Sequence, residues 1–247
     1  PGPLPEGPPN NLQPGGLLGG SRTGDISGFE GISPTPWRPP DPTIAVGPDH
    51  VVVTVNMAVA FYTRDGVETF SANLDSTGNP GFFEAEGAGD FTFDPKCFYD
   101  SASGRFVIVA LEYYDTNEAW IDIAVSDDSD PNGTWFKYRT WAVVEVGDSV
   151  YWVDYPGFGW DEDAFYVTGN LFLLEGNGSG FAGALYRVFP KAPLLTGNDA
   201  TVFDVRRGGH ASVQAAHHHD TAAAAYFVSR RDSSRMRISA VLNPTTD

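Results

Sequence analysis

The chain has 247 residues, and 15 basic against 32 acidic side chains give it a net charge of −17. This excess of negative charge excludes sequence-independent binding to nucleic acid, which depends on neutralising phosphates, and it disfavours anionic membranes. No run of 18 or more apolar residues exists, so no membrane-spanning helix is predicted. The single cysteine, Cys97, excludes an internal disulfide framework, and its place on an expected strand predicts a buried, inert thiol.

Residues 1–40 differ in composition from the rest of the chain. They hold ten of the 19 prolines, and proline removes the backbone donor that a strand ladder or a helix needs. Apolar side chains recur within this segment, at Leu17, Leu18, Phe29, Ile32 and Trp37. A free linker rarely needs such anchors. We therefore divide the chain into a Pro/Gly-rich strap or linker over 1–40, with a strap lying across the domain favoured, and a domain over 41–247.

From residue 41 on, one pattern returns four times. Each unit opens at an Asp-Pro step or a degenerate form of it, and the openings lie 53, 60 and about 59 residues apart, at Asp41-Pro42, Asp94-Pro95, Asp154-Tyr155-Pro156 and Val213-Gln214. Two further apolar runs follow each opening, over 51–55 and 59–62, 106–111 and 121–125, 165–168 and 184–188, and 226–229 and 236–241. A period of this length with several short strands per unit is typical of β-propeller blades. The sequence therefore predicts an all-β propeller with four recognisable blades, complete in itself or part of a larger ring.

Turn residues predict antiparallel hairpins within each unit, for example at Asp65-Gly66. The second unit also shows a fourth strand over 135–141, after the turn at 129–134. The last unit has only about 35 residues, so its strand over 236–241 is expected to be an unprotected edge. We therefore expect another chain segment or a neighbouring subunit to pair with this strand.

Several of these segments together resemble a known family. They are Pro40-Asp41-Pro42-Thr43 with 46–52, Phe93-Asp94-Pro95 with 104–107, the turn at 129–135, and the stretch over 154–159. They are similar to a family of secreted bacterial β-propellers, mostly uncharacterised and loosely labelled sialidase-like, and the resemblance covers about residues 40–190. It implies the propeller fold and a secreted, extracellular or cell-surface location, with the periplasm as an alternative. Sialidase chemistry itself is not indicated, because the expected Arg-Ile-Pro opening is absent and the turn at 129–135 is a poor Asp box.

The opening aspartates Asp41, Asp94 and Asp154 form the first candidate site. First strands of blades line the central channel of a propeller, so equivalent carboxylates are expected to converge around one axis. Like charges that close repel one another unless a cation or donors lie among them, and calcium suits oxygen ligands. The alternative is that each aspartate caps its own turn beside proline.

Two further candidate metal sites lie on turns. Asp128, Asp130 and Asn132 fit the first half of a calcium loop, although Arg139 stands where an EF-hand has its glutamate, and a plain hairpin loop explains the same residues. His217 and His219 share one face of an expected strand and could hold zinc or copper, whereas a hydrated turn is the alternative.

No catalytic motif in the sequence names a reaction. We therefore expect a non-enzymatic extracellular module that holds a protein or glycan partner on one propeller face, with aromatic contacts from Trp120, Trp152, Tyr155 and Trp160. Calcium is the only cofactor expected. The alternative is a polysaccharide-acting enzyme, a glycosidase or lyase of sialidase-like propeller fold, which a suitably spaced carboxylate pair in a groove would favour.

Overall fold

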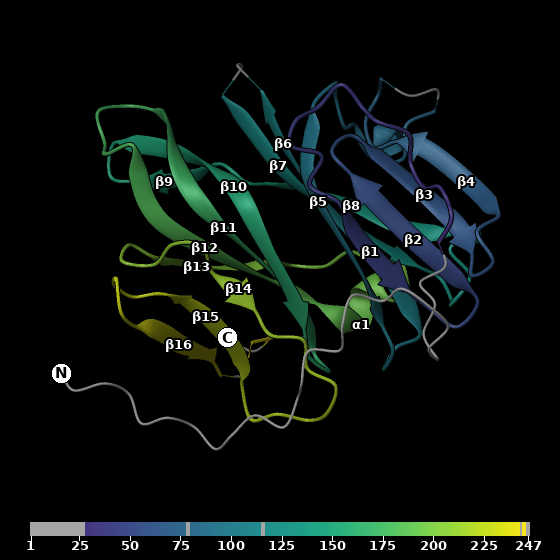
Figure 1. The fold of residues 1–247 in the computed structure, drawn as a ribbon. Coiled ribbons are helices and arrows are strands. Elements are labelled where there is room, and N and C mark those ends of the chain that lie inside the picture. The colour runs from purple at the N-terminus through teal and green to yellow at the C-terminus, as the bar shows by residue number, and fades with distance from the viewer. Residues whose placement is uncertain (1–27, 78–79, 115–116, 243, 246–247) are drawn as a thin grey trace, which may run out of the picture.

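The computed structural model describes residues 28–77, 80–114, 117–242 and 244–245. Its strands form four antiparallel sheets, set side by side like the blades of a propeller (Figure 1). The predicted fold class is thus confirmed. No helix in the described ranges is long and apolar enough to cross a bilayer.

The first two sheets each contain four strands in sequence order. Blade 1 consists of β1 (Thr43–Val46), β2 (His50–Val55), β3 (Ala58–Thr63) and β4 (Glu68–Asn73). Blade 2, reached through a 3₁₀ turn at Glu84–Glu86, consists of β5 (Thr92–Asp100), β6 (Arg105–Tyr114), β7 (Glu118–Ser126) and β8 (Trp135–Trp141). The fourth strand predicted over 135–141 is therefore present.

The third sheet has five strands and the fourth has three. Blade 3 contains β9 (Val144–Val146), β10 (Ser149–Trp160), β11 (Ala164–Glu175), β12 (Phe181–Pro190) and β13 (Phe203–Arg207), with the short helix α1 (Lys191–Leu194) before β13. Blade 4 contains β14 (Gln214–Ala215), β15 (Ala225–Arg230) and β16 (Met236–Val241). Within the described ranges β16 pairs with β15 alone, so the expected pairing with a further segment stays a prediction.

Apolar side chains fill the spaces between neighbouring blades. Phe61, Phe106 and Ile108 belong to the cluster between blades 1 and 2, and Phe98 and Trp160 to the larger cluster between blades 2 and 3. A third cluster between blades 3 and 4 includes Tyr166 and Phe227. Strands buried on both faces explain the nearly continuous apolar runs seen in the sequence. Cys97 is buried in the cluster between blades 1 and 2, and burial raises the pKa of its thiol to about 11, as the prediction of an inert thiol requires.

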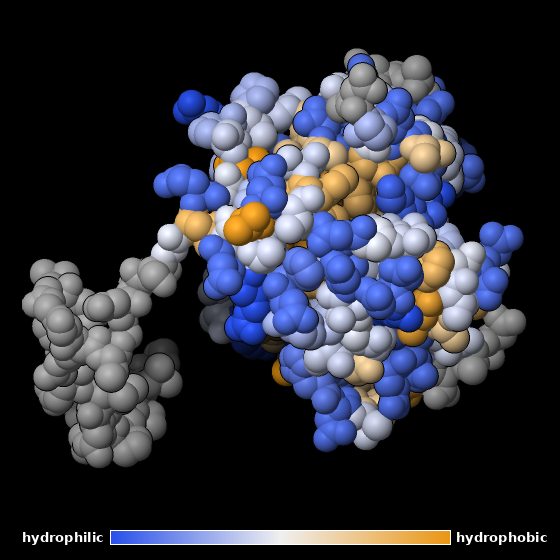
Figure 2. All heavy atoms as spheres, turned by 90° about the vertical axis from the view of Figure 1, so that its right-hand side faces the viewer, coloured by the Kyte–Doolittle hydropathy of each residue, from blue (hydrophilic) through white to orange (hydrophobic). Residues whose placement is uncertain are grey.

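The described end of the N-terminal segment lies against blades 1 and 2. The Phe29 ring lies 5.4 Å from that of Tyr62, and the Trp37 ring lies 5.0 Å from that of Phe91. Ile32 also packs against buried residues of blade 1. Leu17 and Leu18 lie outside the described residues, and the division of the chain at residue 40 stays a prediction. Figure 2 shows a mainly hydrophilic surface on the side of the molecule that lies to the right in Figure 1, with apolar residues gathered in a few places.

The chain takes a left-handed backbone conformation at each blade opening. The φ angles are 44° at Asp41, 46° at Asp94, 56° at Tyr155 and 49° at Ser212. In the first three blades this residue directly precedes a proline. The ladders of β5 and β10 shift register at these positions, between Phe93 and Lys96 and between Asp154 and Gly157. Such bulges re-aim side chains, and strained residues of this kind cluster at functional sites.

Candidate functional site

The three blade-opening aspartates line one pocket. Asp41, Asp94 and Asp154 come from blades 1, 2 and 3, and the pocket that they share has a volume of about 470 Å³. Its remaining walls are mainly aromatic and are formed by Pro39, Asn56, Phe91, Phe93, Tyr113, Trp152 and Tyr155. The structure therefore brings together the carboxylates that the repeat pattern singled out.

Asn56, which directly follows β2, connects two of these aspartates. Its Nδ2 donates to Asp41 Oδ2 at 2.8 Å and to the carbonyl oxygen of Pro39 at 2.9 Å. Its Oδ1 accepts from the backbone N–H of Asp94 at 2.7 Å. Because the Asn56 side chain is buried and uses both ends of its amide, it fixes the spacing between the openings of blades 1 and 2.

The sequence analysis missed Asn56, although the repeat contained a signal for it. Asn56 follows Asp41 by 15 residues, and Asn170 follows Tyr155 by the same interval. The Asn170 Oδ1 accepts from the backbone N–H of Ser212 at 2.8 Å, as Asn56 does from Asp94. In both cases an asparagine, directly after β2 or within β11, therefore holds the left-handed residue of the next blade.

Two of the carboxyl groups in the pocket have raised pKa values. Burial, followed by the negative charges of Asp154 and Asp41, raises the pKa of Asp94 to about 6, and Lys96 only partly opposes this shift. A hydrogen bond between the Asp94 and Asp41 side chains acts in the same direction. Burial also raises the pKa of Asp154. The pocket thus holds a carboxyl, that of Asp94, which keeps its proton in mildly acidic solution.

Aromatic rings form a continuous wall beside the carboxyl groups. The Trp152 ring lies 4.7 Å from Tyr113 and 6.0 Å from Phe93, and Phe93 lies 5.4 Å from Phe91. Tyr155 completes the wall and is 52% exposed. Partly exposed aromatic faces beside hydrogen-bonding groups suit the apolar faces and hydroxyls of sugar rings. Trp152 and Tyr155, predicted to bind a partner, are therefore placed in the pocket.

Trp120 and Trp160 are placed elsewhere. Trp160 is 3% exposed and its ring stacks at 4.0 Å on that of Phe98. Burial of that kind leaves no face for a partner, so the expectation of a partner-binding role is corrected for Trp160. Trp120 lies in blade 2, in contact with Trp141 and with the guanidinium of Arg139.

The calcium hypothesis gains no geometric support. In the described ranges, no group of three or more His, Cys, Asp or Glu side chains has the arrangement to hold a metal ion. In the turn at 128–133, Asp128 Oδ1 accepts from the N–H of Asp130, and Asp130 Oδ1 accepts from both the N–H and Nδ2 of Asn132. These bonds are those of the alternative hairpin turn. Calcium at this turn or among the three aspartates stays a prediction.

The two histidines lie beside Trp160. The His217 ring stacks on Trp160 at 4.1 Å, and its Nε2 donates to the carbonyl oxygen of Phe158 at 3.0 Å. His219 meets the edge of the same indole at 5.8 Å. Burial lowers the pKa of His217. A nitrogen that donates to a carbonyl cannot also ligate a metal, so zinc or copper would have to bind His217 through Nδ1.

No protein-family model matches the sequence, and a search of curated proteins finds no significant relative. Solved structures with a similar arrangement of strands include a xylan β-1,4-xylosidase from Bacillus halodurans (11% identity, TM-score 0.45, covering 84% of this chain and 42% of that enzyme). A second is a GH43 endo-arabinanase from Bacillus licheniformis (12% identity, TM-score 0.43, covering 81% of this chain and 70% of that enzyme). A third is an exo-β-1,3-galactanase from Clostridium thermocellum (12% identity, TM-score 0.37, covering 83% of this chain and 49% of that enzyme). The chain spans less than half the length of the xylosidase and of the galactanase.

These neighbours correct one expectation from the sequence. Each is named as a glycan-cleaving enzyme, whereas we expected a non-enzymatic binding or assembly module. The alternative, a polysaccharide-acting enzyme, agrees better with the comparison and is taken forward. At this level of similarity the neighbours concern the propeller fold, and they address neither secretion nor the sialidase-like label. The case for an activity is therefore built on the pocket.

Proposed function

We propose that the protein hydrolyses glycosidic bonds in the pocket formed by Asp41, Asp94 and Asp154. The observation that carries the proposal is the convergence of three carboxyl groups from three blades on one aromatic-walled pocket, with the pKa of Asp94 raised to about 6. Glycoside hydrolysis uses a pair of carboxyl groups, one protonated and one ionised, on either side of the scissile bond.

The surroundings of each aspartate support a division of roles. Asp94 keeps its proton in mildly acidic solution and gives it to the oxygen of the departing sugar as the bond to the anomeric carbon breaks. Asp41 is hydrogen-bonded to both Asp94 and Asn56 and is therefore too close to Asp94 to act on the opposite side of the bond. Asp154 is the carboxylate that takes the proton of the water molecule that attacks the anomeric carbon. The negative charge of Asp154 helps to keep the proton on Asp94. The water adds its hydroxyl to one sugar, and the proton from Asp94 completes the hydroxyl of the other.

The aromatic wall supplies the binding that this chemistry needs. Trp152, Tyr155 and Phe93 present ring faces on which sugar rings can stack, close to the carboxyl groups. Polymeric glycans are encountered outside cells, so the proposal agrees with the expectation of a secreted protein, which stays a prediction.

The test is release of reducing ends from xylan, arabinan and galactan by the full chain. Activity is expected to fall as the pH rises through about 6, because Asp94 then loses its proton. The variants Asp94→Asn and Asp154→Asn are expected to lower kcat at least 100-fold, which is the low end of the effect of a general acid or base. Asp65→Asn, in the exposed hairpin turn of blade 1, is the matched control and should leave kcat unchanged. Absence of release from all three polymers, or full activity of Asp94→Asn, would refute the proposal.

A further inference from the structure

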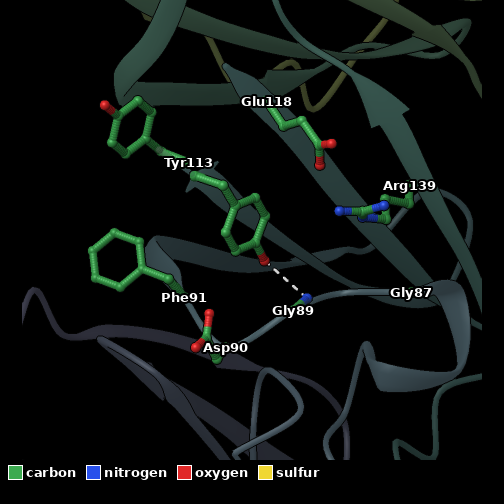
Figure 3. Close-up of a pocket in the computed structure, with 8 residues that line it drawn as sticks. Gly87, Gly89, Asp90, Phe91, Tyr113, Glu118 and Arg139 are labelled. Atoms are coloured by element: carbon green, nitrogen blue, oxygen red, sulfur yellow. Dashed lines mark hydrogen bonds between the residues drawn. The ribbon is translucent and has the colours of Figure 1, made fainter. Parts of the chain in front are cut away.

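A second pocket adjoins the first along blade 2. It has a volume of about 790 Å³ and is lined by Gly87, Gly89, Asp90, Phe91, Tyr113, Tyr114, Glu118 and Arg139 (Figure 3). Phe91 and Tyr113 line both pockets. The two cavities are therefore successive parts of one groove. Phe91 and Tyr113 form the step between them, and a ligand in the first cavity can extend into the second.

Arg139 is held rigidly in the second pocket. Its Nε and Nη2 donate to the two carboxylate oxygens of the buried Glu112 at 2.7 and 3.1 Å, and its guanidinium lies 3.8 Å from the ring centroid of Trp120. Nη1 has no hydrogen-bond partner among the residues that the structure describes. A side chain at Gly87 would begin 3.7 Å from Nη1, so glycine leaves this donor uncovered toward the pocket. A fixed donor beside an open cavity is preorganised for an oxygen acceptor of a ligand.

The charges behind Arg139 balance one another. Asp122 is fully buried, and neither of its carboxyl oxygens has a partner among the described protein donors. Burial, followed by the negative charge of Glu112, raises the pKa of Asp122 well above its usual value, so this carboxyl stays neutral. The negative charge of Glu112 then cancels the positive charge of Arg139.

The rim of the pocket is acidic. Asp90 and Glu118 line it on opposite sides, and Figure 3 shows Glu118 and Arg139 together on one side with Asp90 across from them. With the guanidinium already neutralised, these two carboxylates leave the pocket with a net negative charge. A carboxylate ligand would be repelled here, whereas sugar hydroxyls can donate to Asp90 and Glu118 and accept from Arg139.

We propose that this second pocket is a binding subsite for a neutral sugar unit of the same glycan chain, and that its acidic rim rejects uronic acid units. The inference rests on the proposed hydrolase function, which it deepens by naming the substrate class. Tyr113 and Phe91 offer ring faces at the step between the pockets, Arg139 Nη1 donates to a sugar oxygen, and the rim carboxylates accept from hydroxyls. The substrate is accordingly a neutral oligosaccharide or polysaccharide long enough to occupy both pockets.

The test is calorimetric binding to the full-length Asp94→Asn variant, in which turnover is suppressed. The probes are xylose, arabinose and galactose oligosaccharides of two and five units, and the galactose pentasaccharide with its C6 hydroxyls oxidised to carboxylates. At least one neutral pentasaccharide should bind at least tenfold more tightly than its disaccharide. The neutral galactose pentasaccharide should bind at least tenfold more tightly than its oxidised form.

A second substitution addresses the rim directly. Added to Asp94→Asn, Glu118→Gln should weaken binding of the neutral pentasaccharide about tenfold, which corresponds to one hydrogen bond to a charged group, and should narrow the preference over the oxidised chain. Glu145→Gln, at the one exposed position of β9, is the control, and circular dichroism checks that both variants fold. Equal binding of short and long chains, tighter binding of the oxidised chain, no binding of any probe, or no effect of Glu118→Gln would overturn the subsite.

These outcomes separate the subsite from the hydrolase proposal. If Asp94→Asn binds a neutral pentasaccharide with these preferences while the wild-type protein hydrolyses no polymer, the hydrolase function fails and the subsite stands. If the wild-type protein hydrolyses glycans without any dependence on chain length or C6 charge, the subsite fails and the hydrolase function stands.

Discussion

Replacing Asp94 by asparagine should stabilise the protein in a pH-dependent way. Because the folded state raises the pKa of Asp94 from 3.8 to about 6, it favours the neutral carboxyl. The stability that Asp94 contributes is therefore fully present below the unfolded pKa near 4, and it is lost as the pH rises through about 6. The full shift corresponds to about 3 kcal/mol, and we take about 1.5 kcal/mol because the side chain is only half-buried and solvent screens it.

An asparagine side chain is neutral at every pH and can still donate to Asp41. Asp94→Asn should therefore match the wild-type free energy of unfolding within about 0.5 kcal/mol at pH 4 and exceed it by about 1.5 kcal/mol at pH 8. For a domain of this size, that gain raises Tm by about 3–6 °C. The same variant is expected to lose activity. Asp94 would then be an example of a residue that is kept for catalysis although it lowers the stability of the folded protein.

Urea unfolding followed by tryptophan fluorescence, in dilute solution at pH 4, 6 and 8, measures these differences. Asp65→Asn controls for the loss of one unit of net charge. A stability difference that is the same at all three pH values would refute the reasoning, because it would show that Asp94 does not titrate differently in the folded and unfolded chain. Lower stability of Asp94→Asn at pH 8 would refute it as well.

Two further substitutions test the packing and the pocket. Phe98→Ala should lower the free energy of unfolding by about 3–5 kcal/mol, because the ring is 6% exposed and stacks on Trp160 between blades 2 and 3; a loss below about 1 kcal/mol in urea unfolding would contradict this packing. Asn56→Ala removes the bonds to Asp41 and Asp94 and should cost about 2 kcal/mol, with at least a tenfold fall in kcat. If kcat of that variant equals the wild-type value while stability falls, Asn56 is structural only.

The repeat pattern was sufficient to predict the blades and the meeting of the aspartates. A repeated unit places equivalent positions at equivalent points around one axis, so the openings of the first three blades had to come close once the fold was a propeller. Asp154, one residue before the equivalent Tyr155, lines the same pocket as Asp41 and Asp94. Which of them holds a proton could not be read from the sequence. That property depends on burial and on the distances between carboxyl groups, and these arise only when three blades are assembled.

The prediction that Trp160 binds a partner was wrong because of an irregularity in β10. Trp152 and Trp160 are eight residues apart, so both would face the same side of a regular strand. The register shift between Asp154 and Gly157 reverses the alternation, since Tyr151 and Val153 face the core before it, whereas Phe158 and Trp160 do so after it. Trp152 is thereby directed to the pocket and Trp160 to the core. The Asp-Tyr-Pro sequence indicates an irregular strand. Which side of the sheet the later residues face can be determined only from the strand pairing in the structure.

The backbone strain at the blade openings is a structural feature of the fold, and the aspartates at three of these openings are a separate feature. Ser212 opens blade 4 with the same left-handed backbone as Asp41 and Asp94, and Asn170 holds it as Asn56 holds Asp94, yet Ser212 brings no carboxylate. A non-glycine residue in this region costs of order 1–3 kcal/mol, so four such positions need a common structural reason. That reason is the bend by which each blade begins. The strain alone is therefore no sign of catalysis; the functional signal is that three of the four bends carry or adjoin an aspartate whose side chain lines the same pocket.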